Sequence, residues 1–336
     1  MSPSSHRDPP PMGITMGDAA GIGPEIIVQL FRHGLPQRTV VYGDAGILEA
    51  TITRLGLGGQ LSVRQIASPE TADATPGLLQ VLNRWKPLPA NLPPGRVSPL
   101  AGQGSYEYLC HAIDDAKQSL LRAIVTAPLN KEAMQAGGAN YPGHTEILAE
   151  RTGTSHYAMM LANLELRVIL VTIHMALANV SAHITLESEL NTIRLARLAC
   201  RQAGITAPRV AVAGLNPHAG ENGRFGKEEV TVIAPAIAQA RAEGIDASGP
   251  WPGDTVFMRA RQGEFDIVVA QYHDQGLIPV KYLGVDHGVN VTVGLPFVRT
   301  SVDHGTAFDI AGKGIADFTS LRAAYDMALA MTPQYS

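Results

Sequence analysis

Short apolar runs recur along the chain, and amphipathic stretches separate them. Their residues are mostly β-branched or small, and within a run the apolar and polar positions do not alternate strictly. Such runs are typical of strands in a parallel sheet that is covered on both faces. Their alternation with helical periodicity predicts a doubly wound α/β protein. The runs are MGITMG (12–17), TVVYGD (39–44), AIVTAP (123–128), RVILVTIH (167–174), RVAVAG (209–214) and DIVVAQYH (266–273).

Two stretches have the apolar spacing of a helix that lies on a sheet. The first spans residues 186–203, and the second runs from about residue 232 to residue 243. Each is followed at once by a glycine, Gly204 or Gly244, and a glycine in this place is the expected helix end.

The composition indicates a globular protein with a small-molecule partner. Hydrophobic residues make up 45% of the 336 residues, charged residues make up 17%, and the net charge is −4. Because the chain has no basic footprint, we expect neither nucleic acid nor a membrane as a partner. The length allows two domains, each with a full core.

The cysteine content and the absence of long apolar runs predict a cytoplasmic protein. Cys110 and Cys200 are too few for a disulfide framework or a Cys-rich zinc module. Residues 1–11 are polar and Pro-rich and lack the apolar segment of a secretory signal, so we expect a disordered tail there. No run approaches the roughly 18 apolar residues that a membrane span needs.

Three of the predicted strands lead into a histidine, namely His174, His218 and His273. Because open α/β sheets bind ligands at the carboxyl ends of their strands, we expect the three imidazoles at one edge. Three imidazoles can hold a divalent metal and leave one position open for water or substrate. Taken singly, each could be an ordinary hydrogen-bonded residue at a strand end, but the three together favour a metal site.

Cationic and polar residues near the same predicted edge could hold an anion. Lys281 and Arg299 could form charge-assisted hydrogen bonds with a phosphate or carboxylate, and Asn290 could donate another. His144 and Thr145 stand on a loop directly after a glycine and are weaker candidates. The alternative is that these side chains simply face solvent.

The segment TMGDAAGIGPEI (15–26) has the form of a strand, a Gly-rich turn and a helix. Pro24 suits the first helical turn, and Glu25 would face the positive end of the helix. The segment lacks both G-x-G-x-x-G and the Walker Lys-Ser/Thr pair. Neither the dinucleotide-binding fingerprint nor a P-loop therefore applies.

The chain contains four long motifs: GDAAGIGPE (17–25), GLNPHAGENGRFG (214–226), YHDQGLIPVK (272–281) and GLPFVRTSVDHGTAFDIAGKG (294–314). In this order they resemble the motifs of the 4-hydroxythreonine-4-phosphate dehydrogenase family, and the resemblance spans nearly the whole chain beyond the tail. Because this family is similar in fold to isocitrate and isopropylmalate dehydrogenases, we expect a two-domain α/β/α fold with the active site in the interdomain cleft. The first α/β domain would comprise residues 12–130 plus 300–336. The second, residues 131–299, would carry most metal and substrate residues.

The resemblance also implies roles for individual residues. It implies a homodimer whose metal site is completed across the interface, and an acidic residue, Asp309, that favours NAD over NADP because a carboxylate would repel a 2′-phosphate. The implied metal ligands are His174, His218 and His273. The implied substrate ligands are His144, Thr145, Lys281, Asn290 and Arg299. The implied cofactor residues are His304, Gly305, Asp309 and Ile310.

The activity that the resemblance implies belongs to pyridoxal phosphate biosynthesis. NAD would oxidise the 3-hydroxyl of 4-phosphohydroxy-L-threonine with the help of a divalent metal, and the resulting β-keto acid would lose carbon dioxide. Three imidazoles suit zinc better than magnesium, with cobalt as a further option. Lys281, Asp254 and Asp274 are the alternative proton acceptors.

Other functions stay open at this point. Ala19 stands where the family usually has Pro. The Met-Gly-Asp form at Met16 to Asp18 resembles a paralogous branch, whose members oxidise 4-phospho-D-threonate or 4-phospho-erythronate. A more distant branch acts on the cis-dihydrodiol of terephthalate. From other classes, a metal-dependent hydrolase or aldolase and a non-redox phosphometabolite-binding protein are the alternatives.

Overall fold

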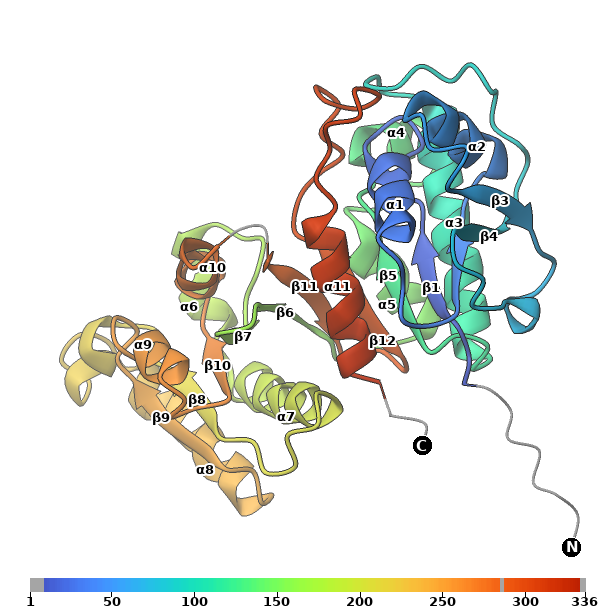
Figure 1. Cartoon of the computed structure of the whole chain (residues 1–336). Coiled ribbons are helices and arrows are strands. Elements are labelled where there is room, and N and C mark those ends of the chain that lie inside the picture. Colours follow the sequence, from blue (N-terminus) through green and yellow to red (C-terminus); the bar gives the residue numbers. More distant parts are fainter. Residues whose placement is uncertain (1–8, 285–286, 333–336) are drawn as a thin grey trace, which may run out of the picture. The chain divides into compact units, whose positions relative to one another are not determined.

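The computed structural model describes residues 9–284 and 287–332, and its contacts divide the chain into two compact units (Figure 1). The first unit comprises the described residues up to Gly153 and from Pro296 onward, and the second comprises Thr154 to Leu295. Among the described residues, no helix is long and apolar enough to cross a membrane.

The first unit contains a parallel sheet of strand order β3-β4-β2-β1-β5-β12. Strands β1, β2 and β5 are buried along their whole length, as their apolar runs predicted. Strand β12, which was not predicted, is equally buried although it contains Arg299, Thr300 and Ser301. Helix α1 packs with α2 and α11, whereas α3 packs with α4 and α5. The strands are β1 Met12–Thr15, β2 Thr39–Tyr42, β3 Ser62–Gln65, β4 Leu78–Leu82, β5 Ala123–Thr126 and β12 Val298–Val302; the helices are α1 Gly23–Arg32, α2 Ala45–Arg54, α3 Pro99–Lys117, α4 Lys131–Ala136, α5 His144–Thr152 and α11 Thr319–Ala330.

The second unit contains a mixed sheet of strand order β11-β6-β7-β10-β8-β9. Strands β7, β10, β8 and β9 are parallel, whereas β6 is antiparallel to both β7 and β11. The strands are β6 Ala158–Ala162, β7 Arg167–Leu170, β8 Val210–Ala213, β9 Ala247–Trp251, β10 Ile267–Ala270 and β11 Val289–Val293; the helices are α6 Val180–His183, α7 Leu186–Gln202, α8 Ala234–Ala242, α9 Val256–Arg261 and α10 His273–Tyr282.

Alternate residues of the parallel strands form a core with α9 and α10. Val168 of β7, Ala211 of β8 and Val268 of β10 pack with Phe257 and Leu277 in one buried cluster. Burying a side chain of this size stabilises the fold by about 1.5–3 kcal/mol. This core fixes where the strands end, and therefore where the polar residues beyond them begin.

Both predicted helices are present. Helix α7 begins at Leu186, where Thr185 and Ser188 form a capping box, and its C-cap is Ala203. Helix α8 ends at Ala242, and one turn of π-helix precedes it at Glu229–Ile233. The prediction of an α/β fold built from alternating strands and helices is confirmed.

The unit boundaries differ from those expected, because residues 131–153 belong to the first unit. A Cβ atom on Gly102 of α3 would lie 2.0 Å from the backbone of Ala133, so α3 and α4 are in backbone contact. Further along α3, Asp114 pairs with Arg151 of α5 at 3.0 Å. The second boundary falls at 295/296 rather than 299/300, which places the whole of β12 in the first unit.

The expected tail lies mostly outside the described residues. Pro11 is described, and its carbonyl oxygen accepts a hydrogen bond from the Arg122 backbone N–H at 2.9 Å. This hydrogen bond therefore joins the chain to the segment before β5 one residue before β1 begins.

Replacing Gly102 with Ala should lower the free energy of unfolding by at least about 2 kcal/mol, because the added methyl group overlaps the Ala133 backbone, which cannot move without separating α3 from α4. Thermal unfolding measures the change. Gly59→Ala is the matched control, since a Cβ atom at Gly59 meets nothing within 4 Å. Equal stability of the two variants would contradict the close contact of α3 and α4.

Candidate functional site

The three predicted metal ligands follow three neighbouring parallel strands of the second unit. Strand β10 lies between β7 and β8, and both pairings are parallel. His174 comes four residues after β7 ends at Leu170, and His273 comes three residues after β10 ends at Ala270. His218 comes after β8. The structure therefore places all three beyond carboxyl strand ends, where open α/β sheets bind ligands.

His174 and His273 form a close pair. Their ring centroids lie 5.7 Å apart, with an angle of 44° between the ring planes. The Nδ1 atom of His273 is 2.7 Å from Oδ1 of Asp274, which orients the ring and directs Nε2 away from that carboxylate. A carboxylate on the far nitrogen is the usual partner of a metal-binding histidine. The pair can supply two nitrogen ligands to one ion.

His218 is held separately, on a loop of unusual backbone conformation. It lies in a short helical turn, Pro217–Glu221, and its φ angle is 54°. Glu229 fixes the start of this turn, since its carboxylate accepts hydrogen bonds from the backbone N–H of Asn216 at 2.6 Å and from the Asn216 side chain at 3.0 Å. Within residues 9–284 and 287–332, no three His, Cys, Asp or Glu side chains come close enough to hold a metal ion.

A hollow of 680 Å³ opens beside His218 in the second unit. Two of the three candidate proton acceptors, Asp254 and Asp274, line it together with His218. The third, Lys281, lies in the last turn of α10 and is half-buried. The hollow therefore combines acidic groups with an imidazole on a mainly apolar wall, as ligand sites commonly do.

A hydrogen-bond network ties the three strand ends together. The buried side chain of Gln271 donates from Nε2 to the carbonyl oxygen of Ala213 at 2.8 Å, which joins β10 to β8. The Gln271 carbonyl oxygen accepts from the Thr172 hydroxyl at 2.7 Å, which joins β10 to β7. Gln275 adds a second link by donating to the carbonyl oxygen of Gly214 at 2.8 Å. Sequence reasoning missed Gln271, although it lies two residues before His273.

The predicted anion ligands are divided between the two units. Arg299 on β12 is 2% exposed and donates to the Thr126 hydroxyl at 2.7 Å; burial lowers its pKa to about 9, against the opposing effect of Glu146. His144 begins α5, followed by Thr145. Burial, together with the positive charges of Arg299 and Lys131, holds the pKa of His144 well below its ordinary value. The lowered pKa favours the neutral ring, which has one donor and one acceptor nitrogen.

These three residues, His144, Thr145 and Arg299, lie in the first unit and not in the second, where they were expected. Arg299 and the first turn of α5 provide a guanidinium, a hydroxyl and a helix N-terminus, which all suit an anion. Lys281 and Asn290 lie in the second unit. The Oδ1 atom of Asn290, on β11, is buried and has no hydrogen-bond partner among the described residues.

The predicted cofactor loop packs on the Gly-rich turn that precedes α1. The buried carboxylate of Glu25 accepts hydrogen bonds from the backbone N–H groups of Gly312 and Gly314. Ile22 N–H donates to the carbonyl oxygen of Thr306 at 3.0 Å. Beyond its place near the helix end, Glu25 thus joins the two motifs. The predicted cofactor residues in this loop are His304, Gly305, Asp309 and Ile310, of which Gly305 and Asp309 are exposed and His304 and Ile310 are half-buried.

Asp18 is a buried acid in the same turn that sequence reasoning did not single out. Its Oδ1 atom accepts from the Ala20 backbone N–H at 2.8 Å, and its buried Oδ2 atom has no partner in the described part of the chain. Burial raises the pKa of Asp18 to about 6, against the effect of the Ala20 hydrogen bond. The sequence could not predict that Asp18 is buried, because its burial arises from tertiary packing.

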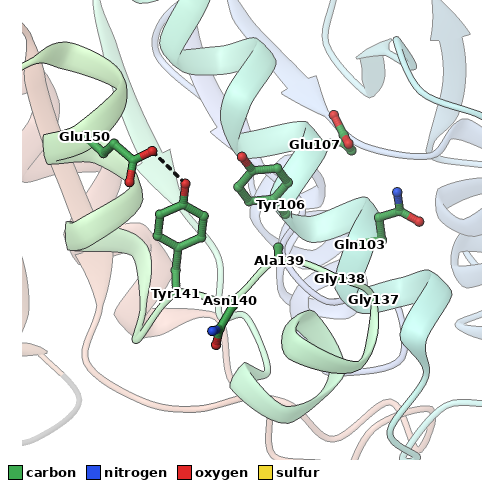
Figure 2. A pocket seen from close by; sticks show the side chains of 9 residues that line it. All are labelled: Gln103, Tyr106, Glu107, Gly137, Gly138, Ala139, Asn140, Tyr141 and Glu150. Atoms are coloured by element: carbon green, nitrogen blue, oxygen red, sulfur yellow. Dashed lines mark hydrogen bonds between the residues drawn. The ribbon is translucent and has the colours of Figure 1, made fainter.

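A second hollow, in the first unit, contains none of the predicted site residues. Tyr106 of α3 stacks on Tyr141 with ring centroids 5.7 Å apart, and the Tyr141 hydroxyl donates to Glu150 at 2.9 Å (Figure 2). Its wall bears carboxylates and tyrosines but no histidine. It is therefore a poorer candidate for metal binding than the hollow beside His218.

Comparison with known proteins identifies close relatives. Residues 36–328 match the family model of the pyridoxal phosphate biosynthetic protein PdxA. The chain is 55% identical over 332 residues to 4-hydroxythreonine-4-phosphate dehydrogenase of Beijerinckia indica subsp. indica, with 97% of each chain covered. It is 50% identical over 316 residues to D-threonate 4-phosphate dehydrogenase of Cupriavidus necator, covering 93% of this chain and 94% of that one.

The fold also matches a solved structure. A crystal structure of a 4-hydroxythreonine-4-phosphate dehydrogenase from Burkholderia phymatum agrees with a TM-score of 0.88 at 46% identity, covering 97% of this chain and 99% of that one.

The pKa of Asp18 predicts a pH dependence of stability. Because the folded-state pKa is raised from 3.8 to about 6, the folded chain holds a proton that the unfolded chain releases, and stability falls as pH rises between these values. Asp18→Asn keeps the acceptor for Ala20 and removes the titration. It should be more stable than the parent by roughly 2–3 kcal/mol above pH 6, and by little at pH 4.

Denaturant unfolding at pH 4 and pH 7 measures this difference. Asp309→Asn is the control, because it shows how loss of an exposed carboxylate changes the free energy of unfolding at each pH. A stability difference for Asp18→Asn that is the same at both pH values would show that Asp18 is not protonated in the fold.

Proposed function

Because the chain belongs to the family of the pyridoxal phosphate biosynthetic protein PdxA, we propose that it is an NAD-dependent dehydrogenase of a 4-phosphorylated hydroxy acid. Its substrate is 4-phosphohydroxy-L-threonine, whose 3-hydroxyl is oxidised before the β-keto acid loses carbon dioxide. The observation that carries this proposal is the group of three histidines that follow adjacent parallel strands, in a chain that also buries Arg299 beside His144.

A second substrate has specific support. The relative from Cupriavidus necator is a D-threonate 4-phosphate dehydrogenase, and its 50% identity is close to the 55% of the Beijerinckia enzyme. Both substrates carry a terminal phosphate and a hydroxyl beside a carboxyl-bearing carbon. The same anion ligands therefore serve either one, and the choice depends on the groups that contact the substrate's amino or hydroxyl substituent.

The residues present fit a divalent metal. His174 and His273 supply two imidazoles, Asp274 orients one of them, and the exposed His218 supplies a third from a second copy of the chain. Zinc suits such a nitrogen ligand set better than magnesium does. When bound, the ion lowers the pKa of the substrate hydroxyl and stabilises negative charge on its oxygen.

In this proposal a second copy of the chain supplies the third ligand, because no three metal-ligating side chains come together among the described residues of one chain. Two exposed apolar side chains of α10, four residues apart, support a surface on this helix that a second chain covers. Ile278 is 64% exposed and Tyr282 is 90% exposed. Both lie on the helix that His273 begins. Exposed apolar residues next to a site are typical of a surface that another protein covers.

The remaining residues bind and orient the reactants. In this proposal Arg299, His144 and Thr145 bind the phosphate, and Lys281 and Asn290 are further residues of the substrate clamp. Such a clamp fixes the reacting carbon, and a misplacement of about 1 Å costs roughly a hundredfold in rate.

The loop after β12 would hold NAD, and the negative charge of the exposed Asp309 would disfavour a cofactor that carries a 2′-phosphate. Asp254 is the proton acceptor that we favour, because Asp274 is engaged by His273.

A screen for NAD reduction tests the function. We expect turnover with 4-phosphohydroxy-L-threonine or D-threonate 4-phosphate, and none with the cis-dihydrodiol of terephthalate, which has no phosphate for Arg299. Dialysis against a chelator should abolish turnover, and added zinc should restore it. Turnover that survives removal of all metal would exclude the proposed metal site. Absence of NAD reduction with every phosphorylated substrate would favour a hydrolase or a binding protein.

Mixing two inactive variants tests the shared site. His174→Ala and His218→Ala should each be inactive alone. In a mixed dimer, one site combines the intact His174 and His273 of one protomer with the intact His218 of the other. Random exchange of protomers should therefore restore about one quarter of the parental activity.

Mixing His174→Ala with His273→Ala is the control, because these two residues act from the same protomer and no intact site can form. Failure of the first mixture to recover, with exchange verified by mass spectrometry, would show that each metal site is built from one chain.

A further inference from the structure

Lys131 is a cation of the first unit that the proposed reaction does not use. It begins α4, five residues after β5 ends at Thr126, and its side chain is exposed. Among the residues that the structure describes, it forms no hydrogen bond and no ion pair. Because open α/β sheets bind ligands beyond the carboxyl ends of their strands, an ammonium group without a partner in this place calls for an explanation.

The stability of α4 does not explain the lysine. The N-cap of this helix is Asn130, whose side chain accepts a hydrogen bond from the Ala133 backbone N–H at 2.8 Å. Lys131 takes no part in this cap. A cation in the first turn of a helix is disfavoured by the positive end of the helix dipole. The helix therefore gains nothing from the ammonium group.

The neighbours of Lys131 include residues to which the proposed function assigns the phosphate. The Cε atom of Lys131 lies 3.8 Å from the position that a Cβ atom on Gly143 would occupy, and Gly143 directly precedes His144 at the start of α5. Burial is the main cause of the lowered pKa of His144, and the positive charges of Arg299 and Lys131 add to it. Two cations therefore act on one imidazole.

The charge balance around His144 depends on Lys131. Glu146, in the first turn of α5, places its Oε2 atom 3.5 Å from the same Cβ position on Gly143, and its negative charge acts on Arg299. The charges of Arg299 and Glu146 offset each other, so Lys131 supplies the net positive charge of this group. A phosphate monoester carries a charge of about −1.5 to −2 at neutral pH and needs such a surplus.

We propose that Lys131 is a further substrate-binding residue, whose ammonium group contacts the terminal phosphate beside Arg299 and His144. This assignment rests on the proposed function, because it names the part of the substrate that Lys131 contacts. An ammonium group on a flexible stem donates charge-assisted hydrogen bonds to phosphate oxygens from several directions. All three residues belong to the first unit, which thus provides two cations for a doubly charged group.

Binding of inorganic phosphate, measured by calorimetry on the whole chain, tests the contact without turnover. Lys131→Met should bind phosphate roughly 10–100-fold more weakly than the parent, because one charge-assisted contact is lost. Lys131→Arg keeps the charge and should stay within about tenfold. Lys86→Met is the matched control and should bind like the parent, since Lys86 is an exposed lysine of the same unit that lies over the Trp85 ring.

Parental phosphate affinity in Lys131→Met would overturn the proposal, and so would a parent that binds no phosphate. Because the Lys131 side chain is exposed and takes no part in the helix cap, the variant should fold, and its thermal unfolding should match that of the parent.

The charge balance makes a second prediction, of opposite sign. Glu146→Gln keeps the size of the side chain but removes its negative charge, so the variant should bind phosphate roughly threefold more tightly than the parent. The same calorimetric titration measures this change. Unchanged or weaker binding by Glu146→Gln would contradict the charge balance that supports Lys131.

Steady-state kinetics distinguish a phosphate contact from a structural role. Lys131→Met should raise KM for the phosphorylated substrate roughly 10–100-fold and leave kcat within about threefold, because the contact is remote from the reacting carbon. A lower kcat at unchanged KM would exclude the contact. If the parent reduces no NAD with any phosphorylated substrate, the proposed function fails, whereas calorimetry still decides whether Lys131 binds phosphate.

Discussion

The parallel pairing of β10 with β7 on one side and β8 on the other is the constraint on which the candidate site depends. It brings three segments that are far apart in the sequence to one sheet edge. The apolar core beneath holds the strands, and Gln271 links their carboxyl ends through Ala213 and Thr172. The segments that carry the three histidines therefore all start from strand ends that are held in place, which is what accurate positioning requires.

In the first unit, too, a buried polar side chain joins two segments of the chain, but here the side chain accepts hydrogen bonds instead of donating them. A buried carboxylate, Glu25, binds the backbone N–H groups of Gly312 and Gly314, and so connects the Gly-rich turn before α1 to the loop after β12. Because backbone groups are the partners, the contact fixes loop conformation independently of neighbouring side chains. This contact packs together two motifs that lie almost three hundred residues apart in the sequence.

The sequence predicted those features that depend on local pattern. Apolar runs predicted β1, β2, β5, β7, β8 and β10, but not the parallel strands β3, β4, β9 and β12. The residues that follow three of the predicted strands pointed to His174, His218 and His273. It did not reveal that β6 and β11 run antiparallel, or that α4 packs on α3 through Gly102, because pairing partners are set by distant residues. Asp18 was missed for the same reason, since its burial arises from tertiary packing.

The backbone around His218 has a further consequence for how a ligand would be received. His218, Ala219, Glu221 and Asn222 all have φ angles between 43° and 56°, a region that costs non-glycine residues about 1 kcal/mol or more each. Hydrogen bonds from Asn216 to Glu229 keep the loop in this conformation. The backbone of this loop is therefore already ordered in the folded chain. A ligand that bound to the His218 imidazole would cost less backbone conformational entropy than one that bound to a flexible loop.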